Sequence, residues 1–318
     1  MVVSLRESTA AHFSRRGATG RRGCLGRRGE LSSGSVHGRM PPFRCPCGGR
    51  GGRHDGALPH PLNALQTRRE MSVTRRGANT LREMSAVVLA ASHGTSSPAG
   101  QAAVRRLVDS VGERMPVPVL RCHVDVEQPS VPAALADVPE GGQAVIVPLL
   151  LSAGYHVYVD LAEAAAASPV PARVTAALGP DARLVDVLAQ RLREAGYDGC
   201  ASVVLAAAGS SDPRAVADCR RTGELLAERL SAPVAVGFLS AAAPTVAEAV
   251  AAARAVRPQA SVIVSPYLLA PGYFLDLVGE AGADIVADPL LTPESTPPEV
   301  VDVVVDRARS DAAVTAAR

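Results

Sequence analysis

The sequence predicts an α/β protein built from two tandem copies of one unit, each a four-stranded parallel sheet flanked by helices. Two observations predict this fold class. Short, fully apolar segments rich in valine and leucine alternate with amphipathic segments of helical periodicity, which is typical of parallel strands covered by helices on both faces. The order of these segments then repeats after about 115 residues, which indicates an internal duplication.

The first unit contains four predicted strands and the helices that connect them. AVVLAAS (86–92) is a short apolar strand, and a Gly-Thr-Ser-Ser-Pro loop leads from it into a helix that begins at Pro98. The strand VPVLRCHVDV, the short helix SVPAALADV and the apolar strand QAVIVPLLL follow. A helix from about Val159, the strand ARVTAAL and the helix DARLVDVLAQRLREAG complete the unit.

The second unit repeats this order. Its first strand and loop read SVVLAAAGSSDP, and the five residues Val87–Ala91 recur unchanged as Val203–Ala207. A long helix and the strands APVAVGFL, ASVIVSPY and ADIVADPLL match the later elements of the first unit. We therefore expect two domains, 84–199 and 200–311, followed by a short tail, 312–318.

The N-terminal extension, residues 1–83, differs in composition from the rest of the chain. Residues 1–84 hold 16 arginines against 5 acidic residues, whereas the remainder holds 17 arginines against 26 acidic residues, and lysine is absent throughout. An Arg- and Gly-rich segment without apolar periodicity cannot bury enough surface to fold, so we expect the extension to be disordered. Because Met84 directly precedes the first strand, we also expect the functional protein to begin at Met71 or Met84.

Three other interpretations of this extension stay open. Its arginines could bind nucleic acid, or it could be a transit peptide. It could also hold zinc, although a Cys-x-Cys pair with irregular outliers is not a recognised zinc spacing. The residues available for such a site are Cys24, His37, Cys45 and Cys47.

The remaining features exclude two protein classes. No apolar stretch reaches the roughly 18 residues that a membrane-spanning helix needs. The other three cysteines, Cys122, Cys200 and Cys219, are widely spaced, so we expect buried free thiols and no disulfide framework. Both observations favour a cytoplasmic protein.

Three predicted strands of the first unit carry a metal-type donor at or just past their carboxyl ends. These donors are His93, Asp125 and His156. The aligned positions of the second unit hold Gly209, Ser240 and Phe274. In open α/β sheets the loops at this edge converge and bind ligands. Two imidazoles and a carboxylate suit Fe, Co, Ni or Zn and leave coordination positions open. We therefore expect one metal-handling site, lost from the second unit, where Phe274 packs in place of the histidine.

Other residues near this edge are candidates for supporting roles. His123 stands two residues before Asp125, on the same face of the strand, either as a core residue or as a helper. The first loop of each unit leads into a helix N-terminus, whose free N–H groups favour anions. The candidates for substrate contact in these loops are Gly94, Thr95, Ser96 and Ser210. A simple strand-to-helix turn with an N-cap is the alternative.

Four segments of the chain resemble the sirohydrochlorin chelatase family, the small class II chelatases related in fold to ferrochelatase. The segments are VVLAASHGTSSP, HVDVEQPSV, VPLLLSAGYHVYVDL and VTAALGPDARLVDVL. The resemblance covers residues 84–290 and implies two tandem chelatase-like (flavodoxin-like) domains, with specific motifs in the first and weak ones in the second. The family's two metal-handling histidines map onto His93 and His156. Its acidic residue, usually Glu, falls at Asp125, four residues before Pro129.

This resemblance implies insertion of Fe²⁺ or Co²⁺ into the tetrapyrrole sirohydrochlorin, on the routes to sirohaem or cobalamin. It implies that the histidines hold the metal and accept the pyrrole protons, that Asp125 helps to hold or deliver the metal, and that no cofactor is needed beyond this substrate metal. Because protons compete with metal for imidazole, we expect activity to fall below about pH 6 to 6.5. Two fused units could close one site alone, so we expect a monomer.

Two other functions stay open. A non-catalytic carrier of divalent metal, or metallochaperone, would use the same ligands and leave the tetrapyrrole unchanged. A nucleotide-binding α/β protein is disfavoured, because neither glycine loop reads G-x-G-x-x-G and the chain has no lysine for a P-loop. Nucleic-acid binding rests wholly on the N-terminal extension.

Overall fold

The computed structural model describes residues 86–154 and 159–310, all of which belong to one compact unit. The predictions for the N-terminal extension, for His156 and for the tail at 312–318 lie outside these ranges. No helix in the two described ranges is long and apolar enough to cross a membrane.

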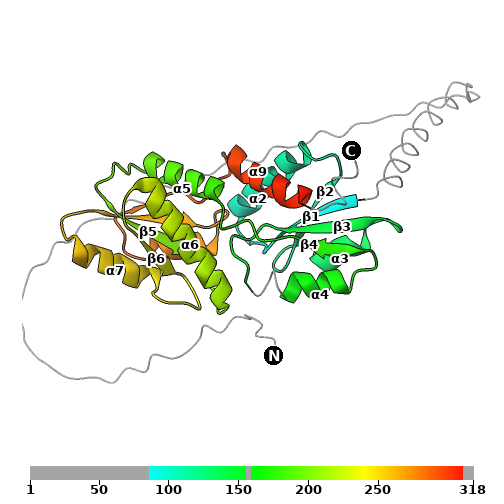
Figure 1. Ribbon diagram of the computed structural model, residues 1–318, viewed down its shortest axis with the longest axis horizontal. Helices are drawn as coiled ribbons and strands as arrows, with labels where there is room; N and C mark the ends of the chain where they lie inside the picture. Colours follow the sequence, from blue (N-terminus) through cyan, green and yellow to red (C-terminus); the bar gives the residue numbers. More distant parts are fainter. Residues whose placement is uncertain (1–85, 155–158, 311–318) are drawn as a thin grey trace, which may run out of the picture. The chain divides into compact units, whose positions relative to one another are not determined.

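The described residues form two four-stranded parallel sheets, which confirms the predicted fold class (Figure 1). The strand orders are β2-β1-β3-β4 and β6-β5-β7-β8. The first sheet consists of β1 (Ala86–Ser92), β2 (Val119–His123), β3 (Gln143–Pro148) and β4 (Ala172–Val174). The second consists of β5 (Ser202–Ala207), β6 (Val234–Phe238), β7 (Val262–Tyr267) and β8 (Ile285–Val286). The helices are α2 (Pro98–Gly112), α3 (Val131–Ala136), α4 (Leu161–Ala166), α5 (Ala182–Glu194), α6 (Pro213–Leu230), α7 (Val246–Val256), α8 (Tyr273–Gly279) and α9 (Pro298–Arg309).

The helices after the first strand of each sheet begin in the same way. The side chain of Ser97 accepts a hydrogen bond from the Gly100 N–H at the start of α2, and Pro98 occupies the first turn. Asp212 caps α6 in the same manner, with Pro213 in the first turn. A polar N-cap followed by proline ends the strand and starts the helix at a fixed residue. Both strand-to-helix turns are therefore set locally by sequence.

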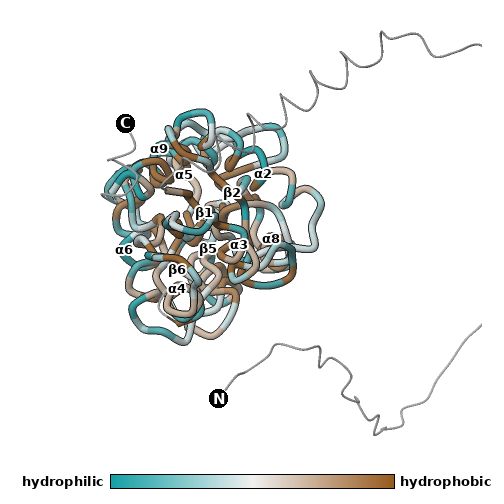
Figure 2. The backbone as a smooth tube through the Cα atoms, turned by 90° about the vertical axis from the view of Figure 1, so that its right-hand side faces the viewer, coloured by the Kyte–Doolittle hydropathy of each residue, from teal (hydrophilic) through white to brown (hydrophobic). Residues whose placement is uncertain are grey.

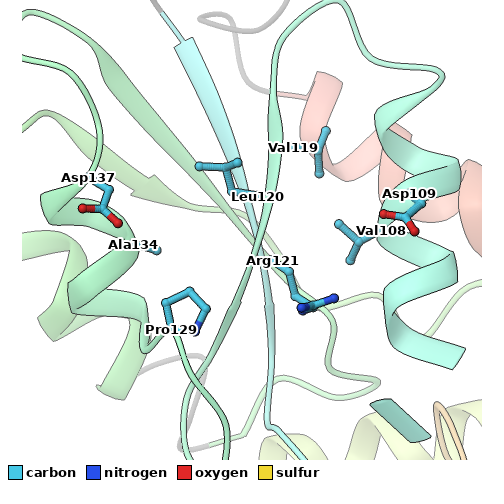
Figure 3. Close-up of a pocket in the computed structure, with 8 residues that line it drawn as sticks. All are labelled: Val108, Asp109, Val119, Leu120, Arg121, Pro129, Ala134 and Asp137. Atoms are coloured by element: carbon cyan, nitrogen blue, oxygen red, sulfur yellow. The ribbon is translucent and has the colours of Figure 1, made fainter. Parts of the chain in front are cut away.

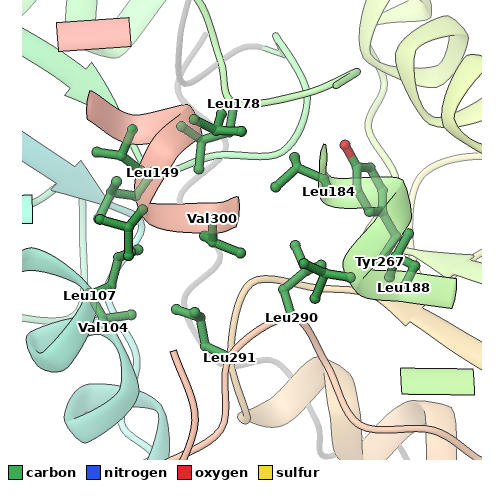
Figure 4. Packing of buried hydrophobic residues seen from close by; sticks show 14 of the residues in the cluster. Val104, Leu107, Leu149, Leu178, Leu184, Leu188, Tyr267, Leu290, Leu291 and Val300 are labelled. Atoms are coloured by element: carbon green, nitrogen blue, oxygen red, sulfur yellow. The ribbon is translucent and has the colours of Figure 1, made fainter. Parts of the chain in front are cut away.

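The two units exchange helices. Helix α5 follows β4 in the chain but packs against α6 and β7 of the second unit, and α9 follows β8 but packs against α2 and β3 of the first. Figure 4 shows Leu184 and Leu188 of α5 beside Tyr267 of β7, within the same cluster as Val300 of α9 and Leu107 of α2. One hydrophobic cluster therefore contains residues of both sheets.

Polar contacts accompany this exchange. The Arg307 side chain of α9 donates hydrogen bonds to the carbonyl oxygens of Ala177 and Leu178, at 2.9 and 3.0 Å. Across the other junction, Arg229 of α6 pairs with Asp186 of α5 at 2.7 Å. In Figure 2, hydrophobic residues gather along the strands, while hydrophilic residues cover the outer turns of α6 and α9. The exchanged helices thus bury their apolar faces. Polar contacts of Arg307 in α9 and of Asp186 in α5 also join them to their neighbours.

The structure corrects the alignment of the two units by one residue. The Val124 N–H donates to the Ser92 carbonyl as the Leu239 N–H donates to the Ala207 carbonyl, and both Gly94 and Gly209 follow with positive φ, so positions 115 residues apart are equivalent. The identical Val87–Ala91 and Val203–Ala207 segments are 116 residues apart. A one-residue slip turns every strand side chain to the other face, and Val88, not Val87, shares the large common core with Val203.

This correction changes one of the three matched pairs. His93 corresponds to Ala208 rather than to Gly209, which corresponds to Gly94. The pairing of Asp125 with Ser240 is unchanged, because both lie 115 residues apart. The imidazole at the end of the first strand is therefore replaced by a methyl group in the second unit.

The exchanged helices predict that the two units unfold together. Leu188 of α5 is fully buried in the shared cluster. Leu188→Ala should cost about 2–5 kcal/mol of unfolding free energy and lower one transition that includes both sheets. Denaturant unfolding followed by far-UV circular dichroism measures this, with Val256→Ala, at an 81% exposed residue, as the control. Two separate transitions, of which only one shifts, would contradict the shared core.

Candidate active site

The loops after β1 and β2 lie against one another at the carboxyl edge of the first sheet. The Asp125 N–H donates to the His93 carbonyl at 2.9 Å. Gly94 has φ +95°, and a Cβ at this position would lie 2.1 Å from the Asp125 carbonyl oxygen. Only glycine tolerates both conditions. His93 and Asp125 thus stand at neighbouring strand ends, as predicted, and both residues are exposed there.

The loop after His93 uses most of its polar groups internally. The Thr95 N–H donates to Glu127 Oε1 at 2.9 Å, and Thr95 Oγ1 accepts from the Ser97 N–H at 3.1 Å. Ser96 is exposed. In the second unit, Ser210 Oγ accepts from the N–H of the capping residue Asp212. The N-cap alternative therefore describes this geometry, while substrate contact by Gly94, Thr95, Ser96 and Ser210 stays a prediction.

A buried polar group lies beneath these two loops. The His123 side chain is 1% exposed, and a hydrogen bond of 2.8 Å joins its Nδ1 to Ser92 Oγ. Glu127 Oε1 lies 3.8 Å from the same nitrogen. Burial lowers the pKa of His123, the nearby Glu127 carboxylate raises it, and Arg121 lowers it further. The imidazole is therefore buried mainly in its neutral form.

The loop after β3 is held by the second unit. The Tyr267 hydroxyl donates to the Leu151 carbonyl at 2.9 Å, and the Ala153 N–H donates to Asp218 Oδ2 at 3.0 Å. A Cβ at Gly154 would lie 3.2 Å from Ser210 Oγ. His156, two residues further on, lies outside the described residues.

The converse contact joins the second unit to the loop of His93. A Cβ at Gly272 would lie 3.1 Å from Thr95 Oγ1, and a Cβ at Gly100 would lie 2.3 Å from the Pro271 carbonyl oxygen. The loop after the third strand of each unit therefore packs on the loop after the first strand of the other. Both units thus build the surroundings of the candidate ligands.

Phe274 stands near the start of α8 with a partly exposed side chain. Its side chain is 37% exposed, and that of its neighbour Tyr273 is 69% exposed. The two ring centroids are 5.8 Å apart. Because α8 begins at Tyr273, directly after Gly272, the pair stands beside the loop that contains Thr95. That Phe274 packs in place of the histidine stays a prediction, because His156 lies outside the described residues.

Within 86–154 and 159–310, no three His, Cys, Asp or Glu side chains are close enough to hold a metal ion. Since His156 lies outside these ranges, this finding does not test the predicted set. A hollow of about 370 Å³ lies along β2 between α2 and α3, lined by Leu120, Arg121 and Pro129 among others (Figure 3). It runs along the strand and contains none of the predicted ligands.

The described cysteines are free, as expected. Burial raises the pKa of the Cys122 thiol to about 12 and that of Cys219 to about 11, so neither is a thiolate at neutral pH. Cys200 is exposed, contrary to expectation, because it lies in the loop before β5, where its N–H donates to Asp198. None of these thiols joins the candidate site.

Comparison with known proteins identifies the family. The model of the CbiX family matches residues 87–195 and 202–285, in both units. The chain belongs to the CbiX family of sirohydrochlorin chelatases. It is accordingly a metal chelatase.

Solved structures share the fold of this CbiX-family chain. SirB from Bacillus subtilis with Fe³⁺ gives a TM-score of 0.62 at 23% identity and covers 74% of this chain and 98% of its own. CbiX, described as the terminal enzyme of siroheme biosynthesis in denitrifying bacteria, gives 0.52 at 21% identity, with 70% and 98% covered. No curated protein sequence gives a significant match.

Four residues around the candidate site were not predicted from the sequence. Ser92 and Glu127 support the first-unit loops, and Asp218 and Tyr267 reach them from the second unit. A signal existed for Glu127, which stands four residues after His123 in the same loop segment. The contacts of Asp218 and Tyr267 are non-local and leave no short-range pattern.

The glycines after the two first strands provide a matched test. Gly94→Ala and Gly209→Ala each force a side chain into positive φ and against a carbonyl, at 2.1 and 1.9 Å respectively. Each should lower the unfolding free energy by at least about 1–2 kcal/mol. The two losses should be similar, because the two turns are equivalent.

Gly94→Ala should reduce metal insertion much more than Gly209→Ala, since it displaces the two loops that carry His93 and Asp125. Thermal unfolding together with a chelatase assay measures both effects. Equal loss of activity in the two variants would show that activity follows stability rather than the first-unit loop.

Proposed function

We propose that this chain inserts Fe²⁺ or Co²⁺ into sirohydrochlorin, with His93, His156 and Asp125 handling the metal. The observation that carries the proposal is the asymmetry of two equivalent strand ends. In the first unit the Asp125 N–H joins the His93 carbonyl, and in the second the same bond joins Ser240 to Ala208. The backbone is kept in both, while the imidazole and carboxylate stand only in the first.

The named structures support iron or cobalt as the metal substrate. One structure of SirB from Bacillus subtilis is a complex with Fe³⁺, and another, at 20% identity, is a complex with cobalt. Imidazole and carboxylate ligands suit both Fe²⁺ and Co²⁺. We therefore propose either metal as substrate, for the sirohaem or the cobalamin route, and no further cofactor.

The chemistry assigns distinct roles to the proposed ligands. Two pyrrole N–H protons must leave the macrocycle as the divalent ion enters, and neutral imidazoles can accept them. His93 and His156 would take this role as well as binding the incoming ion. Asp125 Oδ1 accepts from the Val126 N–H at 2.8 Å, which orients the carboxylate at the loop tip. A carboxylate so placed can deliver the metal to the imidazoles.

The tetrapyrrole would dock on surfaces from both units. Tyr273 and Phe274 expose apolar ring surface beside the loop of Thr95, which suits the face of a macrocycle. Ser96 is an exposed hydroxyl near the start of α2, where helix N–H groups favour the substrate carboxylates. Because one chain supplies both walls, we propose that a monomer suffices; the cytoplasmic location stays a prediction.

The decisive test is metal insertion by the full-length chain. Anaerobic incubation with sirohydrochlorin and Fe²⁺ or Co²⁺, followed by the absorption change of the macrocycle, should show acceleration over the uncatalysed reaction. His93→Ala and His156→Ala should each lose at least about 100-fold in rate, in the range that one acid–base group contributes.

A matched pair controls for loop disruption. Asp125→Ala should reduce the rate, whereas Ser240→Ala, at the equivalent exposed position, should leave it unchanged. Tight metal binding without acceleration by the wild-type chain would favour the metal-carrier function. Wild-type rates in both histidine variants would overturn the site assignment.

The exposed aromatic pair predicts an effect on substrate affinity. Phe274→Ala should raise KM for sirohydrochlorin about 2- to 10-fold, because an aromatic contact contributes about 0.5–1.5 kcal/mol. The melting temperature should change little, since the ring is already 37% exposed. Steady-state kinetics and thermal unfolding measure the two quantities. A large fall in stability with unchanged KM would contradict the docking surface.

A further inference from the structure

The duplicated fold contains an internal control for the buried polar group beneath the candidate ligands. The first unit holds Ser92, His123 and Glu127. At the equivalent positions, 115 residues further on, the second unit holds Ala207, Phe238 and Ala242. Phe238 is as buried as His123, each at 1% exposure. The same place in the fold is therefore filled by a polar group in one unit and an apolar group in the other.

The backbone of these loops does not depend on the polar group. The Val124 N–H donates to the Ser92 carbonyl at 2.9 Å, and the Leu239 N–H donates to the Ala207 carbonyl at the same distance. The glycines that follow have φ values of +95° and +89°. Since the apolar version supports the same turn, forming the turn does not explain Ser92, His123 and Glu127.

The polar version carries a cost that the apolar version avoids. His123 Nε2 is buried and has no hydrogen-bond partner in the described part of the chain. An unpaired buried polar atom destabilises the folded state. A phenylalanine at this position would remove that cost, as Phe238 does in the second unit. The retained histidine therefore indicates a function rather than a contribution to stability.

The contacts of this group show which function it can serve. Glu127 Oε1 accepts from the Thr95 N–H at 2.9 Å, so it joins the loop after β1 to the loop after β2. Thr95 is two residues after His93, and Glu127 is two residues after Asp125. Ser92 and His123 lie directly before the same two loops and are hydrogen-bonded to each other at 2.8 Å. The group thus connects the segments of both candidate ligands from below.

We propose that Ser92, His123 and Glu127 form a positioning network that fixes the mutual geometry of His93 and Asp125 for metal insertion. The network acts through the two loops and does not itself bind the metal or the tetrapyrrole. Its carboxylate anchors the Thr95 N–H, and its buried imidazole and hydroxyl hold the strand ends beneath. This inference rests on the proposed function, because it assigns the purpose of the network to that site.

The sharpest test grafts the second-unit residues into the first. The triple variant Ser92→Ala, His123→Phe, Glu127→Ala should fold with a melting temperature at or above that of the wild type. Its kcat for metal insertion should fall at least tenfold, with KM for sirohydrochlorin within twofold. The reverse graft, Ala207→Ser, Phe238→His, Ala242→Glu, should lower the melting temperature and leave kcat within twofold. A folded triple variant with wild-type kcat would overturn the proposal.

A second pair keeps the proposal testable if the triple variant does not fold. Glu127→Gln keeps an acceptor oxygen for the Thr95 N–H, whereas Glu127→Ala removes it. The glutamine variant should retain most of the wild-type kcat and the alanine variant should lose at least tenfold. Wild-type kcat in a folded Glu127→Ala variant would overturn the network role.

A readout that needs no turnover separates this inference from the proposed function. Amide hydrogen exchange at Thr95 should be faster in Glu127→Ala and unchanged in Glu127→Gln. If the wild-type chain inserts no metal, the proposed function fails whatever the exchange shows. Unchanged exchange at Thr95 in Glu127→Ala would overturn the network itself, even in an active chelatase.

Discussion

The exchange of α5 and α9 between the two sheets is the constraint on which the rest of the structure depends. One face of each sheet is covered only in part by its own unit's helix, α2 or α6, and the helix supplied by the other unit completes the cover. Buried apolar area is the main favourable term in folding. Neither unit can therefore keep its core without the other. A second unit that has lost its polar strand-end residues is still required for the fold.

The same dependence extends to the site. Once the units share a core, the loop after the third strand of each lies on the first loop of the other, as Gly272 lies near Thr95 and Gly154 near Ser210. Asp218 and Tyr267 then anchor the loop that precedes His156. The second unit was thus free to lose donor side chains but not its loop backbone, which explains why its turns are retained.

The strands, the duplication and the strand ends of His93 and Asp125 could be predicted, because they follow from local apolar runs and from the topology of parallel sheets. The helix exchange could not, since it is a contact between segments far apart in the chain. The alignment failed by one residue because Val and Ala fill both faces of these strands. The N-caps Ser97 and Asp212 are 115 residues apart and so mark the correct register, but the alignment rested on the strand residues alone.

The residues missed by the sequence lie one layer behind the predicted ligands, and this has a physical reason. A metal ligand must face the open edge of the sheet. Its residue type and its position can therefore be recognised in the sequence at the end of a predicted strand. A supporting residue faces inward, where Phe238 fits as well as His123 and only the contacts distinguish them. A comparison of equivalent positions in the two units shows which buried residues are polar in one unit and apolar in the other. At these three positions the second unit is apolar and keeps the same turn, which is why we assign the buried polar residues beside the proposed ligands a role in the chemistry.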